Sequence, residues 1–289
     1  MSQTKVEKEI RTRSFGQLLN PDGPTEKQQP VLDELTPIIM RYVSPQDLLD
    51  HNRKVYDATA KQYAENPHNQ DVIDEIITFM NRLPNGARVL DVGCAWGRDA
   101  CFMAYDNGPF RAGLMGRKDK NGIPTRERIP APTKRFEVIG IDISLELLKI
   151  AQERARALGL SILFIYDDMH DIFISASGTY ADYFDGVWSC TALFTHTPRV
   201  LLEPAIASVA RVLKPGGMFF VSYTNGAESG VYDKLLASST GHVKYFSRPD
   251  PREVSKLAKK HGLLLIAQNF SDYKESKNLF VSQFFKKVE

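Results

Sequence analysis

Residues 88–97 combine an apolar run, one acid and two glycines in a pattern suited to ligand binding. Asp91 lies in the run, Gly93 and Gly97 follow it at a spacing of four, and a helical pattern begins after Gly97. Glycine has no Cβ, so the backbone at such a turn can approach a ligand where a side chain would collide. We therefore predict a strand, a ligand-binding turn and a helix start; the alternative is a strand-to-helix turn that binds nothing.

Two further apolar runs end in acids. Asp142 follows residues 136–141, and the pair Asp167 and Asp168 follows residues 162–166. A carboxylate at a strand end can accept hydrogen bonds from two vicinal hydroxyls, which is what recognition of a ribose requires. Asp142 lies farther from the glycine turn than the usual spacing of about 20 residues, and the segment 107–135 accounts for the excess. The alternative for Asp142 is a helix-capping acid.

The stretch from Asp91 to Gly97 resembles the first motif of the class I S-adenosylmethionine (SAM) dependent methyltransferases, usually D/E-x-G-x-G-x-G. Ala95 stands where the motif has its middle glycine, and adds one methyl group. The resemblance implies that Gly93 and Gly97 lie against the methionine part of SAM, where the following helix N-terminus favours the carboxylate. It places Asp91, Cys94 and Ala95 among the cofactor-binding residues.

The later strand ends fit the same family. The resemblance implies that Asp142 and Ile143 bind the ribose, that Asp168 accepts from the adenine amino group and that Met169 packs on the ring. Asp167 competes with Asp168, because the register at a strand end is uncertain by a residue or two.

Two architectural signatures of the family also occur. Phe184–Val187 resembles its FD-x-V strand, and Leu213–Gly217 resembles its LKPGG segment, which we expect to be a helix-terminating turn. Cys190 ends the FD-x-V strand where the resemblance places the cofactor. The alternative for Cys190 is a small buried hydrophobic residue.

The segment from Tyr56 to Tyr63 resembles the YD-x-x-A-x-x-Y pattern of small-molecule members, where it forms part of a lid over the cofactor. Tyr56 and Tyr63 lie on one helical face. We assign Tyr63 to the cofactor and Tyr56 to the methyl acceptor, with ordinary core packing as the alternative. An aromatic ring near the sulfonium would add cation–π stabilisation of roughly 1–2 kcal/mol.

The candidate acceptor side begins after the fourth strand, at Phe194 and His196. His196 is the candidate general base, since its reference pKa is near 6.5. Its position is one residue out of step with the histidine of the family, so a polar loop residue is the alternative. Tyr223, Tyr245 and Arg248, on or after the fifth strand, complete the candidate acceptor site; a structural aromatic cluster is the competing interpretation.

Alternating strand and helix patterns from residue 88 predict an α/β fold. Two strands at the end, with only a polar loop between them, predict an antiparallel pair. With the resemblance, this implies a doubly wound, seven-stranded, mostly parallel Rossmann-like sheet with one antiparallel strand and an N-terminal helical lid. We expect an N-terminal arm over residues 1–43 and the methyltransferase domain over 44–289. The strand-like runs are Arg88–Val92, Phe136–Ile141, Ile162–Tyr166, Gly186–Cys190, Met218–Tyr223, Leu263–Phe270 and Leu279–Lys286.

Residues 107–135 form an insertion between the first helix and the second strand of that pattern. From 111 to 135 it holds eight basic residues against Asp119 and Glu127. Two interpretations remain open: a solvated surface excursion, and a flap that contacts an anionic substrate or a partner.

Composition excludes several classes of protein. Lys plus Arg number 37 against 35 Asp plus Glu, a balance that does not favour a nucleic-acid-binding face. No apolar run approaches the roughly 18 residues of a membrane span, and the start lacks an apolar signal core. The three cysteines include no CxxC pair, so we expect no disulfide framework, no metal site and a reduced, cytoplasmic protein.

The sequence therefore predicts a SAM-dependent enzyme that transfers a methyl group to an O or N atom of a small molecule by in-line displacement. Two alternatives stay open. One is a methyltransferase acting on tRNA or a peptide, supported by the basic insertion. The other is a non-catalytic SAM-binding protein. The sequence does not predict the oligomeric state.

Overall fold

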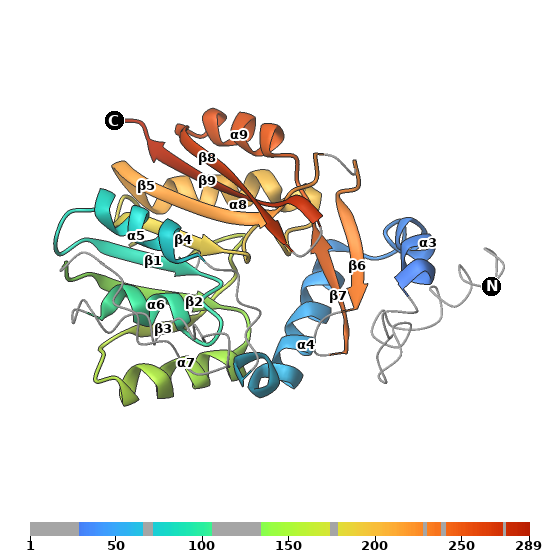
Figure 1. Ribbon diagram of the computed structural model, residues 1–289, viewed down its shortest axis with the longest axis horizontal. Helices are drawn as coiled ribbons and strands as arrows, with labels where there is room; N and C mark the ends of the chain where they lie inside the picture. The colour runs from blue at the N-terminus through green and yellow to red at the C-terminus, as the bar shows by residue number, and fades with distance from the viewer. Residues whose placement is uncertain are drawn as a thin grey trace.

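A single seven-stranded sheet organises the chain (Figure 1). The computed structural model describes residues 29–65, 72–105, 134–173, 179–227, 230–237, 241–273 and 276–289. The strand order is β3-β2-β1-β4-β5-β9-β8. The strands are β1 (Arg88–Val92), β2 (Glu137–Asp142), β3 (Leu163–Tyr166), β4 (Phe184–Cys190), β5 (Leu213–Thr224), β8 (Leu263–Tyr273) and β9 (Ser276–Lys287).

The sheet is parallel apart from one reversed strand. β1 pairs in parallel with β2 and β4, whereas β9 runs antiparallel to both β5 and β8. The predicted mostly parallel sheet and the antiparallel final pair are both confirmed. In a doubly wound sheet of this order, the carboxyl ends of β1, β2 and β4 meet where the strand order reverses, which is where ligands bind.

Helices cover both faces of the sheet. Alternate residues of β1 point to opposite sides: Val89 packs in the cluster that holds Phe102 of α6, and Leu90 in the cluster that holds Ile206 of α8. Strands buried on both faces are typical of a parallel sheet between helical layers. The helices of these layers are α5 (Ile73–Arg82), α6 (Arg98–Ala104), α7 (Leu145–Ala157), α8 (Leu202–Val212), preceded by the 3₁₀ turn η4 (Arg199–Leu201), and α9 (Pro251–Lys260).

A small second unit stands at the end of the sheet. Figure 1 shows the antiparallel hairpin β6–β7 beside α4, with α3 on its far side. The hairpin was not predicted from the sequence. α3 falls within the predicted arm 1–43, of which residues 1–28 lie outside the described chain, as do residues 107–133 of the insertion. The elements of this unit are α3 (Gln29–Ile39), α4 (Pro45–Glu65), β6 (Asp233–Ala237) and β7 (Val243–Ser247).

Local capping signals position the helices. Ser144 caps α7 by accepting from the Leu147 backbone N–H, and Ser44 exchanges hydrogen bonds with Asp47 at the start of α4. The LKPGG segment is a correction: β5 already begins at Leu213, and its pairing with β4 shifts register between Phe184 and Gly186. The segment bulges out of the strand instead of forming a separate turn.

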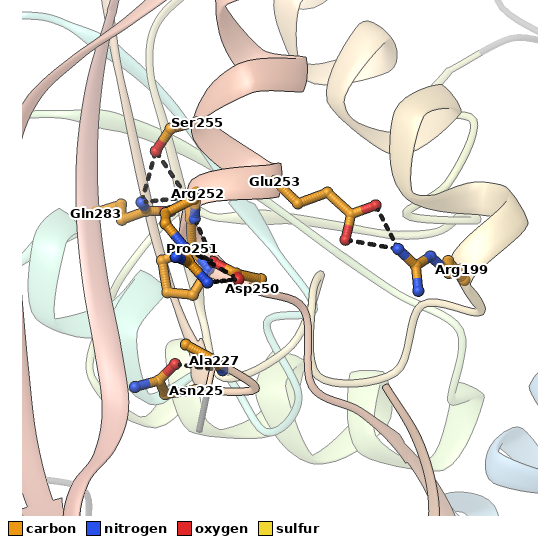
Figure 2. Close-up of polar contacts among 9 residues, drawn as sticks. All are labelled: Arg199, Asn225, Ala227, Asp250, Pro251, Arg252, Glu253, Ser255 and Gln283. Atoms are coloured by element: carbon orange, nitrogen blue, oxygen red, sulfur yellow. Dashed lines mark hydrogen bonds and ion pairs between the residues drawn. The ribbon is translucent and has the colours of Figure 1, made fainter. Parts of the chain in front are cut away.

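The start of α9 is anchored to the sheet through one buried amide (Figure 2). Asp250 caps the helix by accepting from the Arg252 backbone N–H, and the amide nitrogen of Gln283 on β9 donates to the Pro251 carbonyl and the Ser255 hydroxyl. The Gln283 side-chain oxygen in turn accepts from the Tyr223 hydroxyl at 2.6 Å. The Tyr223 hydroxyl is therefore engaged in a hydrogen bond within the core. None of the helices in the described ranges is both long and apolar enough to cross a membrane.

Candidate functional site

A pocket opens at the carboxyl ends of β1, β2 and β4, and α4 forms its outer wall. It encloses about 1030 Å³ of space, its open mouth included. α4 belongs to the small second unit, whereas the strands belong to the main sheet. The pocket therefore lies between the second unit and the sheet. Its lining residues are Leu49, Asn52, Tyr56, Tyr63, Asp91, Gly93, Cys94, Ala95, Trp96, Arg98, Asp99, Asp142, Ile143, Leu147, Asp167, Met169, Cys190, Thr191, Ala192 and His196.

The glycine turn after β1 is tightly constrained. Gly93 and Gly97 have φ angles of +71° and +74°, and a Cβ on Gly93 would lie 2.3 Å from the Cβ of Ala192. Neither position can accept a side chain without strain or collision. Ala95, between them, also adopts a left-handed conformation, with φ +47°. A glycine would hold this conformation at lower cost.

Asp142 fastens that turn to β2. Its Oδ2 accepts from the Ala95 backbone N–H at 2.9 Å, and its Oδ1 accepts from the Ser144 backbone N–H at 2.8 Å. Burial raises its pKa to about 6, which the backbone donors oppose. Each carboxylate oxygen can accept a second hydrogen bond. Asp142 therefore fixes the backbone of the turn and lines the pocket, while the cap of α7 is Ser144.

Asp91 supplies an unpartnered acceptor to the pocket. It is 2% exposed, and no described residue contacts its Oδ2 by a hydrogen bond. Burial, together with the negative charge of Asp99, raises the pKa of Asp91 well above its usual range. Arg98 lies beside this pair, its Nε 2.7 Å from Asp99 Oδ1. Trp188 donates to the other Asp99 oxygen at 2.9 Å, so the guanidinium is held at the pocket wall.

At the third strand end the pocket is lined by Asp167 and not by Asp168, the acid that we assigned to the cofactor. Asp167 and Met169 line the pocket. Asp168 does not: its Oδ1 accepts from the backbone N–H and the ring Nδ1 of His170, at 2.8 and 2.7 Å, and its side chain is half exposed. The pocket therefore brings Met169 together with Asp167, the competing acid at this strand end.

His196 lies in the pocket with both ring nitrogens engaged. Its Nδ1 lies 3.0 Å from the Tyr245 carbonyl oxygen and 3.2 Å from the Asn52 amide nitrogen. We assign the proton to Nδ1, because the carbonyl can only accept and would otherwise face the lone pair of the ring. Nε2 therefore presents its lone pair, and the Tyr56 hydroxyl donates to it at 2.8 Å. Burial and the nearby charge of Lys244 lower the pKa of His196 to about 3, so the ring is neutral at pH 7.

Asn52 joins α4 to the hairpin. Its side-chain oxygen accepts from the Tyr245 backbone N–H at 2.9 Å, and its amide nitrogen donates to the Tyr245 carbonyl at 2.8 Å. This is the pattern that a neighbouring strand would make with β7. The double contact holds the outer wall of the pocket against the hairpin.

Most of the predicted acceptor residues lie elsewhere. Tyr56 lines the pocket, whereas Phe194 and Tyr223 are fully buried in the core and pack on each other at 5.5 Å between ring centres. The Tyr245 hydroxyl donates to Asp233 at 2.7 Å, away from the pocket, and Arg248 is not part of its lining. The predicted cofactor residues Tyr63, Cys94, Ile143 and Cys190 do line it.

Sequence reasoning missed several pocket residues. Arg98 directly follows Gly97, so its place after the turn could have identified it. Asn52 lies one helical turn before Tyr56 on the face that the tyrosine pattern had marked. Lys244 does not line the pocket but contacts Tyr56 and Tyr63, which do, and it gave no signal because nothing in the sequence identified β7 as a strand.

Comparison with known proteins follows this geometry. Residues 122–217 match the family described as "Methyltransferase domain". That match covers about a third of the chain and shows a likeness to methyltransferase domains over these residues. A ubiquinone biosynthesis O-methyltransferase of Xanthomonas axonopodis pv. citri is 29% identical over 179 residues, which cover 57% of this chain and 59% of that protein. A cyclopropane-fatty-acyl-phospholipid synthase of Escherichia coli is 31% identical over 48% of this chain and 27% of its own length. The match thus spans less than two thirds of these relatives.

Solved structures share the fold of this chain. A Burkholderia thailandensis 1,6-didemethyltoxoflavin-N1-methyltransferase, with its namesake compound and S-adenosylhomocysteine bound, superposes with a TM-score of 0.58 over 86% of this chain and 92% of that one, at 14% identity. The [4+2]-cyclase SpnF superposes with a TM-score of 0.57 over 82% and 94% of the chains, at 17% identity. At such identities the likeness establishes the fold alone.

Proposed function

We propose that this chain transfers a methyl group from SAM to an oxygen or nitrogen atom of a small molecule by in-line displacement. The observation that carries the proposal is the unpartnered, buried carboxylate oxygen of Asp91 beside a glycine turn that admits no side chain. A buried acceptor without a partner is costly unless a donor binds there. The ammonium of the methionine part of SAM is such a donor.

The rest of the pocket fits the same group. Arg98 offers a cation for the methionine carboxylate, and Asp142 offers free acceptor capacity for the ribose hydroxyls. Met169 and Ile143 offer apolar surface for the adenine, with Asp167 as the acid at that end. The described residues thus present a cation, acceptors and apolar surface from adjacent elements of one pocket.

When bound, SAM supplies an electrophilic methyl group on a sulfonium. The chain must exclude water, and hold the acceptor in line behind that methyl. Tyr56 and Tyr63, in T-shaped contact at 5.5 Å, form the aromatic part of the outer wall. Nε2 of His196 is the proton acceptor that the pocket offers to a protonated substrate, after displacement of the Tyr56 hydroxyl.

Several observations support a small-molecule acceptor. The pocket is lined by α4 on its outer side, and the named relatives and neighbours include methyltransferases of small compounds. The basic insertion, which motivated the tRNA or peptide alternative, falls mainly outside the described residues. The [4+2]-cyclase SpnF has a similar fold, so this fold also supports other chemistry.

The test is a methyl-transfer screen with labelled SAM against pools of metabolites, peptides and tRNA, preceded by calorimetry of SAM binding. We expect SAM to bind and label to enter a small-molecule pool. Label in tRNA or in peptide would show that the acceptor is one of these and not a small molecule. Binding of SAM with no transfer of label to any pool would favour a non-catalytic protein. Asp91→Asn serves as the matched variant, with weakened SAM binding expected.

A further inference from the structure

A lysine ammonium is buried beside the pocket, and no carboxylate among the described residues pairs with it. Lys244 on β7 is 4% exposed. Within the described ranges no carboxylate forms an ion pair with it, and burial alone lowers its pKa to about 7. A lysine is rarely buried unless it is paired, because taking its charge out of water is costly. Its retention here therefore calls for a ligand or a partner of opposite charge.

Aromatic rings surround this ammonium. Its Nζ lies 4.0 Å from the ring centre of Tyr56, 5.5 Å from that of Tyr63 and 5.7 Å from that of Phe246. Cation–π contacts of this kind offset part of the desolvation cost. They offer no full negative charge, so the site keeps the capacity to bind an anion.

Strand alternation places Lys244 on the face of β7 that contacts the pocket wall, although Lys244 itself is not part of the lining. In β7, Val243 and Tyr245 pack in the cluster with α3 and α4, while Lys244 and Phe246 contact the rings on the pocket side. The Phe246 ring lies 5.0 Å from that of His196. Lys244 therefore belongs to the same group of side chains as Tyr56, Tyr63 and His196, which line the pocket.

We propose that Lys244 binds the methyl acceptor through an ionised oxygen, so that the acceptor class is a small organic acid or acidic phenol with apolar surface. The proposal rests on the function proposed above. The apolar part of such a molecule would pack on Tyr56 and Phe246, and the ammonium would pair with its carboxylate or phenolate. Lys244 is then a specificity-determining residue: it selects anions over neutral compounds of the same shape.

The chemistry of transfer agrees with an anionic acceptor. A lone pair of the ionised oxygen forms the new bond to the methyl carbon while the carbon–sulfur bond breaks and its electron pair stays on sulfur. The anion and the sulfonium become two neutral products, and no proton moves. His196, a weak base because its pKa is about 3, is then not required as a proton acceptor.

The experiment uses matched acids and amides on the whole chain. Wild type saturated with S-adenosylhomocysteine is titrated by calorimetry at pH 6.5 with benzoate against benzamide, and with 2-naphthoate against 2-naphthamide. We expect at least one acid to bind ten-fold or more tightly than its amide. Lys244→Met should abolish the preference and Lys244→Arg should retain part of it. The control is Lys234→Met, since Lys234 in the same hairpin lies 3.4 Å from Asp33 and should not affect the preference.

The outcomes separate the two proposals. Equal or absent binding of both acids and amides, or a preference that survives Lys244→Met, overturns the acceptor assignment. Failure of S-adenosylhomocysteine to bind in a preceding titration counts against the proposed function instead. If Lys244→Met does not fold, NMR of wild type with labelled lysine replaces it: the acid should raise the pKa of one lysine, absent from Lys244→Arg, and an unchanged pKa overturns the proposal.

Discussion

The Tyr56 hydroxyl oxygen lies 2.8 Å from Nε2 of His196 and fills the basic position of that ring. The contact connects the outer wall on α4 to the loop after β4. It exists because the Tyr245 carbonyl fixes the proton on Nδ1 and leaves Nε2 as an acceptor. Tyr56 therefore both lines the pocket and donates a hydrogen bond to His196.

Tyr56→Phe should destabilise the protein by about 1–3 kcal/mol, because Nε2 of His196 loses its donor in a buried site. Urea unfolding measures the change. Tyr63→Phe is the matched control, since no hydrogen bond to its hydroxyl occurs in the described part of the chain, and it should cost under about 0.5 kcal/mol. Equal effects of the two variants would argue against the tautomer assigned to His196.

His196→Ala should affect acceptors according to their charge. For an acceptor that arrives protonated, loss of the base should lower the transfer rate by about 10²–10⁴-fold. For an acceptor ionised before binding, the loss should stay below about ten-fold, because no proton must be removed. Single-turnover assays with acid and neutral acceptors measure both. A large and equal loss for both classes would contradict the anionic route.

Asp142→Ala should weaken SAM binding by roughly 1–3 kcal/mol, the scale of losing hydrogen bonds to a charged group. Calorimetry on the folded variant provides the measurement. Asp168→Ala is the control, since Asp168 pairs with His170 and does not line the pocket. A weakening by Asp168→Ala that matches Asp142→Ala would return Asp168 to the cofactor site.

Ala95→Gly should stabilise the protein by about 0.5–1 kcal/mol, because glycine holds the left-handed φ of +47° without the Cβ penalty. The same substitution in the interior of α6, Ala100→Gly, should destabilise it by about 1 kcal/mol. Thermal or urea unfolding of both variants gives the comparison. Two changes of the same sign would mean that residue 95 is not strained.

Lys244 should make stability depend on pH. Its pKa is about 7 in the folded protein against 10.5 ordinarily, so between these values the unfolded chain binds more protons. Stability should therefore rise as pH increases from 7 to 10.5. Lys244→Met should remove this contribution and be more stable than wild type at pH 6–7 by at least about 1 kcal/mol. The advantage should shrink toward pH 10.

Urea unfolding at pH 6, 7, 8.5 and 10 provides the measurement. Lys234→Met, which removes a lysine paired with Asp33, should run parallel to wild type across this range. The curves of unfolding free energy against pH for wild type and for Lys244→Met could also run parallel. That result would show that the ammonium of Lys244 is not buried in solution.

The parts of the fold visible in the sequence are those set by local signals. β1 is predicted to the residue, and the caps at Ser144 and Asp250 form because a side-chain oxygen meets the first free N–H groups of its own helix. The reversed β9 was also accessible, since a polar loop cannot carry a parallel crossover.

The parts that could not be predicted depend on distant contacts. The hairpin strands gain their burial from α3 and α4, about 200 residues earlier in the chain. Without that register, Tyr245 was assigned to the acceptor site, although its side chain packs in the cluster with α3 and α4. The hydroxyl of Tyr223 donates to Gln283, which lies 60 residues away in the chain. The sequence alone does not show this contact, so Tyr223 was assigned to the acceptor site.

The double hydrogen bond between Asn52 and the Tyr245 backbone also sets an order on synthesis at the ribosome. Its two halves are 193 residues apart in the chain, so the outer wall has no edge to pair with until the hairpin has emerged. The glycine turn and the first strands can form earlier, since their contacts are closer in sequence. In a nascent chain the pocket would therefore lack a fixed outer wall. The wall could be completed only after translation has passed residue 247.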